Sequence, residues 1–175
     1  KVCGRALTVF CHIGDNLMIH KAVSIAHPGD VLVVSIRNDT RSGAWGEILT
    51  TFARSKGVVG LVIDGAVRDA EATRNRNFPV FSRGLAVGAT VKRSLGQINH
   101  PVAIGDQIVH PGDLIVGDID GVVVVPRERA GSVYEASVER ERKEEKLMEK
   151  ISAGATTLDL LGLDSVLDEL GLVEE

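Results

Sequence analysis

Two acidic residues and an arginine stand where their chemistry can be combined. Glu47 is followed by twenty residues and then by the pair Arg68-Asp69. Carboxylate oxygens are the ligands that hard divalent cations prefer, and a guanidinium binds an anionic group in a fixed, forked geometry. The combination predicts a metal-assisted site for a small acid.

The same three residues also admit a purely structural interpretation. An Arg68-Asp69 pair at the start of a helix suits the helix macrodipole, and glutamate is common in the first helical turn, where Glu47 is expected. The functional interpretation gains support because each acid follows a buried strand. If those strands are neighbours, both carboxylates emerge at one edge of the sheet.

The start of the helix at Glu47 offers a second binding element. The first N–H groups of a helix have no partner within the helix, and they can bind a carboxylate. The groups concerned belong to Gly46, Glu47, Ile48 and Leu49. We therefore expect these amides beside the two acids, where they would hold the carboxylate of the substrate.

Other candidate sites are weaker. The stretch Asp118-Ile119-Asp120-Gly121 begins like a calcium loop but lacks the third acid and the final glutamate, so we expect a hairpin turn. The five histidines show no paired metal-ligand spacing, and neither do Cys3 and Cys11. We expect neither a zinc site nor a cysteine nucleophile.

Hydrophobic patterning predicts strand and helix units in the first half of the chain and a β-rich second half. The first half contains strands over 4–11, 31–36 and 58–63, a helix over 16–26 after Asp15, a helix opened by residues 43–47 and ended by Gly57, a tight turn at Asp64-Gly65, and a short helix after Arg68. The second half contains short runs at 80–81, 89–91, 102–104, 107–109, 114–116 and 122–125. This order predicts a mixed α/β layer protein.

The C-terminal part reads differently. Pro126 suits the first turn of a long helix over 127–152, which is dense in charge and cannot bury a broad face. Such a helix is either solvated or reaches a neighbouring subunit. The tail over 153–175 carries leucines in helix-like clusters, which we expect to pack on the body or on a partner. We treat 1–175 as one domain, with the charged helix and the tail at a subunit interface.

Length, composition and charge limit the number of domains, the kind of core and the partners that the protein can have. At 175 residues the chain suits one domain, and with only 3% aromatic residues its core must be aliphatic. The net charge of −4 argues against a nucleic-acid partner. No apolar stretch reaches the roughly 20 residues that cross a bilayer, and no signal peptide is visible. We expect a cytoplasmic protein without a membrane partner.

Several segments together resemble one known family. They are Asp15–Ala22, Pro28–Val34, Gly43–Glu47, Asp64–Asp69, His110–Asp118 and Asp120–Pro126. From about residue 4 to beyond 145, the chain is similar to the class II pyruvate aldolases that cleave 4-hydroxy-4-methyl-2-oxoglutarate and 4-carboxy-4-hydroxy-2-oxoadipate. That group is related to the RraA-like regulators of RNase E. The resemblance implies a swivelling β/β/α domain of the α/β class, with mixed sheets, flanking helices and a long C-terminal helix, assembled as a homotrimer or a homohexamer.

The resemblance also implies a metal site for Mg²⁺ or Mn²⁺. The family's signature of an acid, twenty residues and Arg-Asp is met by Glu47 and Arg68-Asp69. Asp69 would bind the cation directly, and Glu47 would bind it through water. A third acid would come through water from the C-terminal helix of a neighbouring subunit. Glu144 matches best, with Glu145 next to it.

The implied substrate is a small keto acid. Arg68 would bind the pyruvyl group, and amides near Gly46, Ile48 and Leu49 would bind its carboxylate. The implied reaction is retro-aldol cleavage to pyruvate and a second keto acid, with oxaloacetate decarboxylation as a side activity. Two alternatives are a non-catalytic RraA-type regulator of RNase E, which would not need the metal acids, and a keto-acid decarboxylase without aldolase activity.

Overall fold

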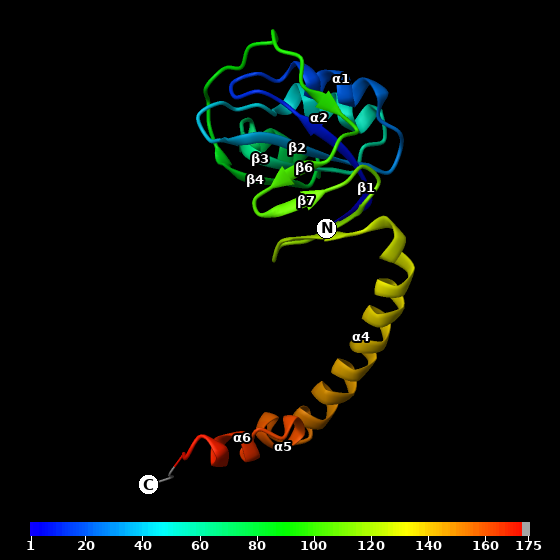
Figure 1. The fold of residues 1–175 in the computed structure, drawn as a ribbon, viewed down its shortest axis with the longest axis vertical. Helices are drawn as coiled ribbons and strands as arrows, with labels where there is room; N and C mark the ends of the chain where they lie inside the picture. The colour runs from blue at the N-terminus through cyan, green and yellow to red at the C-terminus, as the bar shows by residue number, and fades with distance from the viewer. Residues whose placement is uncertain (173–175) are drawn as a thin grey trace. The chain divides into compact units, whose positions relative to one another are not determined.

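The computed structural model describes residues 1–172 and divides the chain into two compact units, 1–129 and 130–175 (Figure 1). Within residues 1–172, every strand lies in the first unit. The second is helical. The placement of one unit relative to the other is not defined, and the assignment of both to one domain stays a prediction.

A seven-stranded mixed sheet forms the centre of the first unit, in the order β4-β3-β2-β1-β8-β9, with β5 also paired to β1. The strands β1 (Val2–Phe10), β2 (Asp30–Asp39), β3 (Gly60–Val67) and β4 (Val80–Leu85) run parallel. Antiparallel neighbours are β5 (Gln97–Ile98), β8 (Leu114–Gly117) and β9 (Val122–Val125). A separate hairpin consists of β6 (Val102–Ile104) and β7 (Gln107–Val109).

The sheet is covered on both faces. The helices α1 (Leu17–Ile25) and α2 (Glu47–Ser55) lie on one side and the β6–β7 hairpin on the other (Figure 1). A further short helix, α3 (Ala70–Asn75), follows β3. This hairpin–sheet–helix layering is the predicted swivelling β/β/α arrangement, so the expected fold class is confirmed.

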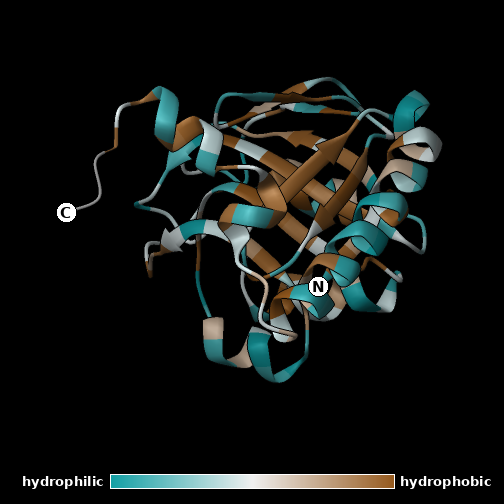
Figure 2. Ribbon diagram, turned by 90° about the horizontal axis from the view of Figure 1, so that it is seen from below, coloured by the Kyte–Doolittle hydropathy of each residue, from teal (hydrophilic) through white to brown (hydrophobic). Residues whose placement is uncertain are grey.

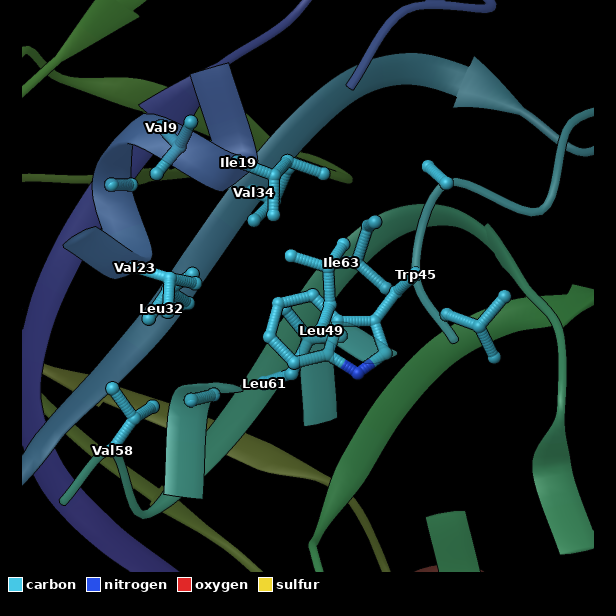
Figure 3. Close-up of a cluster of buried hydrophobic side chains, with 14 of the residues drawn as sticks. Val9, Ile19, Val23, Leu32, Val34, Trp45, Leu49, Val58, Leu61 and Ile63 are labelled. Carbon is cyan, nitrogen blue, oxygen red and sulfur yellow. The ribbon is translucent and has the colours of Figure 1, made fainter. Parts of the chain in front are cut away.

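Alternation along β2 shows why the strands are almost wholly apolar. Leu32 and Val34 pack into the core beneath the helices (Figure 3), whereas Val31 and Val33 belong to the core beneath the hairpin. Successive side chains of a strand point to opposite faces, so a strand buried on both faces needs a continuous hydrophobic run. Figure 2 shows this as hydrophobic colour gathered on the strands, while the helices carry both colours.

Three details differ from the sequence prediction. Asp64-Gly65 is not a turn, because β3 continues through both residues to Val67. A Cβ at Gly65 would lie 2.2 Å from Cδ1 of Ile36, so the glycine here serves close packing within the sheet. The run 89–91 forms only an isolated bridge to Asp15, and the short strand β5 was not predicted.

Asp15 fastens the start of α1 to a distant loop. Its Oδ1 accepts the Leu17 N–H at 2.8 Å, and its Oδ2 accepts the N–H groups of Arg93 at 2.7 Å and Ser94 at 2.8 Å. Burial alone would raise the pKa of Asp15, but these donors outweigh burial and bring the pKa below its ordinary value of 3.8. The N-cap residue of α1 is Asn16 rather than the predicted Asp15.

We expect Asp15→Asn to lower the free energy of unfolding at pH 7 by about 1.5–3 kcal/mol, because the amide nitrogen would face two N–H donors. A depressed folded-state pKa means that the carboxylate stabilises the fold above pH 3.8 and loses this effect as the pH falls through the folded-state value. Denaturant titrations of wild type and Asp15→Asn should therefore show a difference in the free energy of unfolding that is smaller at pH 3 than at pH 7. The exposed Asp106→Asn is the control, and equal stability of both variants at pH 7 would contradict the prediction.

The second unit contains the predicted long helix. The helix α4 (Ala130–Ser152) has no buried residue and begins three residues later than predicted, because Arg127–Arg129, at the end of the first unit, form a 3₁₀ turn. The short helices α5 (Thr157–Leu161) and α6 (Asp164–Glu169) follow. The subunit interface proposed for 127–152 and 153–175 stays a prediction, and 173–175 lie outside the described residues. Within 1–172, no helix is long and apolar enough to cross a membrane.

Candidate active site

The loop before α2 lies alongside the end of β3. The N–H of Ala44 donates to the carbonyl of Ala66 at 3.1 Å, and the N–H of Arg68 donates to the carbonyl of Trp45 at 2.8 Å. These two bonds hold the start of α2 against the residues that follow β3. The site is thus built at the carboxyl edge of parallel strands, the position that the sequence predicts.

Asp69 meets the first residue of α2. Its Oδ2 accepts the N–H of Glu47 at 3.0 Å, and Nε of Arg68 lies 3.8 Å from the same oxygen. Asp69 has a φ of 53°, a left-handed conformation that aspartate tolerates better than most residues. A Cβ at Gly46 would lie 2.4 Å from Oδ2 of Asp69 and 3.0 Å from Cγ of Arg68. The missing side chain of Gly46 therefore makes room for both groups.

The carboxylate of Glu47 binds a residue that sequence reasoning missed. Nη2 of Arg76 lies 2.5 Å from Oε1 of Glu47. The two acids also line separate cavities: Asp69 lines one of about 720 Å³ with Arg68 and Leu85, and Glu47 lines one of about 540 Å³ with Arg76. The structure thus joins Asp69 to the backbone of Glu47, while the Glu47 carboxylate faces Arg76.

A third, smaller cavity of about 110 Å³ lies between Arg68 and α1, lined also by Asn16, His20 and Lys92. Nδ2 of Asn16 donates to the carbonyl of Ala44 at 2.9 Å, whereas its buried Oδ1 accepts no hydrogen bond from residues 1–172. Burial, together with the charge of Lys92, lowers the pKa of His20, which favours a neutral imidazole. Sequence reasoning gave these three residues no role. For Asn16 and His20, the sequence offers one indication of a shared site: they are four residues apart and so lie on one helical face. Lys92 has no such indication.

The predicted amide site lies at the same junction. The N–H groups of Ile48 and Leu49, in the first turn of α2, find no acceptor within residues 1–172. Both residues, with Gly46, line the small cavity beside Arg68. The N–H of Glu47 is already bound to Asp69. Two amides near Arg68 are therefore available to a ligand.

The donor groups suit a hard dication that keeps much of its hydration. No three His, Cys, Asp or Glu side chains within 1–172 are grouped closely enough to hold a metal ion by themselves. Mg²⁺ and Mn²⁺ sites commonly use one or two carboxylates, with water and substrate completing the coordination. The half-exposed Asp69 carboxylate, in the space that Gly46 leaves, fits such a site, and Glu47 adjoins it through its backbone N–H. Glu144, which pairs with Arg140 on α4, belongs to the second unit, and its role stays a prediction.

Comparison with known proteins gives consistent matches. The family model described as RraA-like, Aldolase/RraA, matches residues 1–124. A protein of Halalkalibacterium halodurans, provisionally named 4-hydroxy-4-methyl-2-oxoglutarate aldolase, is 39% identical over 145 residues, which are 83% of this chain and 69% of that protein.

Solved structures agree. An uncharacterized protein from Pseudomonas syringae pv. tomato superposes with a TM-score of 0.81 at 34% identity, covering 88% of this chain and 72% of that one. The RNA-processing inhibitor RraA from Thermus thermophilis superposes with a TM-score of 0.68 at 28% identity, covering 71% and 76%. Sequence and fold lead to the same assignment, and the chain belongs to the RraA-like family.

Proposed function

We propose that this protein is a pyruvate aldolase that depends on a divalent metal ion. It would cleave 4-hydroxy-4-methyl-2-oxoglutarate or 4-carboxy-4-hydroxy-2-oxoadipate to pyruvate and a second keto acid. The observation that carries the proposal is the junction at which Asp69 contacts both the N–H of Glu47 at 3.0 Å and Nε of Arg68 at 3.8 Å. The provisional name of the Halalkalibacterium halodurans relative supports it.

Arg68 is the main substrate-binding side chain in this proposal. It lines both the cavity of about 720 Å³ and the small cavity beside α1, and its side chain is half-exposed, so it would be available to a ligand at the junction. The substrate's carboxylate would accept from the N–H groups of Ile48 and Leu49. Asp69, with Glu47 through water, would hold Mg²⁺ or Mn²⁺, which when bound polarises the keto oxygen and stabilises negative charge on it.

The reaction needs one proton removed and one returned. Loss of the C4 hydroxyl proton forms the new carbonyl and breaks the C3–C4 bond, and the electron pair passes into the enolate of pyruvate. Arg68 stabilises the developing oxyanion, and removing one such donor typically costs 10²–10³-fold in rate. Water held by Glu47 would accept the first proton, and protonation of C3 completes pyruvate. Oxaloacetate decarboxylation would use the same enolate.

The small cavity suits the remainder of such a substrate. Lys92 and His20 present nitrogen donors beside Arg68, which favours a second carboxylate there. The buried Oδ1 of Asn16 needs a donor, and a water molecule beside the bound substrate would supply one. These contacts would distinguish a dicarboxylic or tricarboxylic keto acid from a simple one. We further propose a homotrimer or homohexamer in which Glu144 reaches the site of a neighbouring subunit.

We expect purified protein to release pyruvate from both aldol substrates and from oxaloacetate in the presence of Mg²⁺ or Mn²⁺. EDTA should remove at least 90% of the rate, and excess Mn²⁺ should restore it, because the lost charge stabilisation amounts to several kcal/mol. Lactate dehydrogenase coupled to NADH oxidation measures the product.

The result also separates the alternatives. Release from oxaloacetate alone would indicate a decarboxylase. Release from no substrate, with or without metal, would contradict the proposal and favour a non-catalytic regulator, the activity in the name of the RraA structure from Thermus thermophilis.

A further inference from the structure

The helices α2 and α3 are joined by three contacts along one face of α3. Asp69 binds the N–H of Glu47, Oγ1 of Thr73 lies 3.3 Å from Oγ1 of Thr50, and Arg76 binds the Glu47 carboxylate at 2.5 Å. Asp69, Thr73 and Arg76 are spaced by four and three residues, which places them on one helical face. Both ends of α3 therefore reach the first residue of α2.

The Arg76 contact uses only part of each group. It occupies Oε1 of Glu47, while Oε2 accepts no hydrogen bond from residues 1–172. Nε of Arg76 is buried and has no acceptor within the same residues. Both side chains are about 40% exposed, at 38% and 43%. Ion pairs with this exposure contribute little to folding stability, so stabilisation of the fold is a weak explanation for this pair.

Orientation is the stronger explanation. A glutamate in the first turn of a helix has three rotatable bonds, and a carboxylate that acts through water must be held in one direction. Arg76 fixes one oxygen from the far end of α3 and leaves the other without a hydrogen-bond partner among residues 1–172. We propose that Arg76 is a positioning residue for Glu47, which aligns the free oxygen to accept from water that hydrates the metal ion. The inference rests on the proposed role of Glu47.

A double-mutant cycle tests the coupling with a readout separate from catalysis. Mn²⁺ affinity, from the electron paramagnetic resonance signal of free Mn²⁺, and kcat for pyruvate release are measured for wild type, Arg76→Met, Glu47→Gln and the double variant. Residues that orient a metal's ligands typically affect affinity or activity by 10–100-fold. We expect Arg76→Met to weaken Mn²⁺ binding and lower kcat by about 10-fold, and to have no further effect in the Glu47→Gln background.

Two more variants control for structural damage. Arg74→Met removes the same charge from the same helix, and Arg74 makes no ion pair with the acids of residues 1–172. We therefore expect Arg74→Met to match wild type in both Mn²⁺ affinity and kcat. Arg76→Lys keeps a cation and should recover part of the loss. Thermal melting of each variant reports folding.

Three results would overturn the inference: equal losses from Arg76→Met in both backgrounds, no loss in either, or tighter Mn²⁺ binding, which would mean that Arg76 withholds Glu47 from the metal. A different result bears on the proposed function alone. If wild type releases no pyruvate but the cycle shows coupling in Mn²⁺ affinity, the aldolase proposal fails and the positioning role stands.

Discussion

Replacing Asp69 by asparagine is expected to lower kcat for pyruvate release by about 10³-fold while the fold is kept. Asparagine also tolerates the left-handed backbone at this position, where φ is 53°, and its amide oxygen can still accept the N–H of Glu47. The substitution thus removes the charge and little else. A factor of 10³ corresponds to about 4 kcal/mol, within the several kcal/mol that a metal ion supplies to such a transition state.

Steady-state kinetics and Mn²⁺ titration of Asp69→Asn test this expectation, with circular dichroism to monitor folding. Glu71→Gln is the matched control because Glu71 is an exposed acid on the same short helix. Wild-type turnover in Asp69→Asn would show that the negative charge is not needed, and the proposed metal site would be wrong.

A single added methyl group at Gly46 should also abolish most of the activity. Gly46 has φ −159° and ψ −165°, which alanine adopts freely, so the backbone does not oppose the change. Its Cβ, however, would lie 2.4 Å from Oδ2 of Asp69 and 3.0 Å from Cγ of Arg68. Both side chains must move, and a misplacement of about 1 Å can cost 10²-fold in rate. We expect kcat to fall by about 10²-fold in Gly46→Ala.

Gly84→Ala provides the comparison, because a Cβ at Gly84 meets no atom within 4 Å. Kinetics of the two variants, with thermal melts to confirm folding, separate a local effect from a general one. If Gly46→Ala turned over like Gly84→Ala, the positions of Asp69 and Arg68 would not matter for the chemistry.

Much of the fold is predictable because burial on both faces leaves a clear pattern. The runs at 31–36 and 58–63 are almost wholly apolar, and they form β2 and β3 side by side in the sheet. The neighbouring strands then bring the backbone of Glu47 to Asp69, as their order along the chain predicts, whereas the Glu47 carboxylate faces Arg76. The prediction of a turn at Asp64-Gly65 was wrong. A glycine after an acid is typical of turns, but this glycine lies within a strand, where a Cβ would clash with Ile36.

The remaining site residues depend on contacts that local sequence does not encode. Lys92 reaches the junction because Asp15 binds the loop next to it, across 78 residues in the case of Arg93. Arg76 ends a helix too short to show a periodic pattern, and only its partner on α2 reveals a role. Such residues are recognised by distance in space, which requires the coordinates.

The strand order has a consequence for solubility. β9, four consecutive valines, is the last strand of the sheet, and no other strand of residues 1–172 pairs along its outer side. An apolar border strand is a template on which foreign chains can add and aggregate. Here it is bracketed by Asp118 and Asp120 on one side and by Pro126-Arg127 on the other, residues that discourage β addition. These flanking residues therefore lower the tendency of β9 to pair with a further strand, independently of any catalytic role.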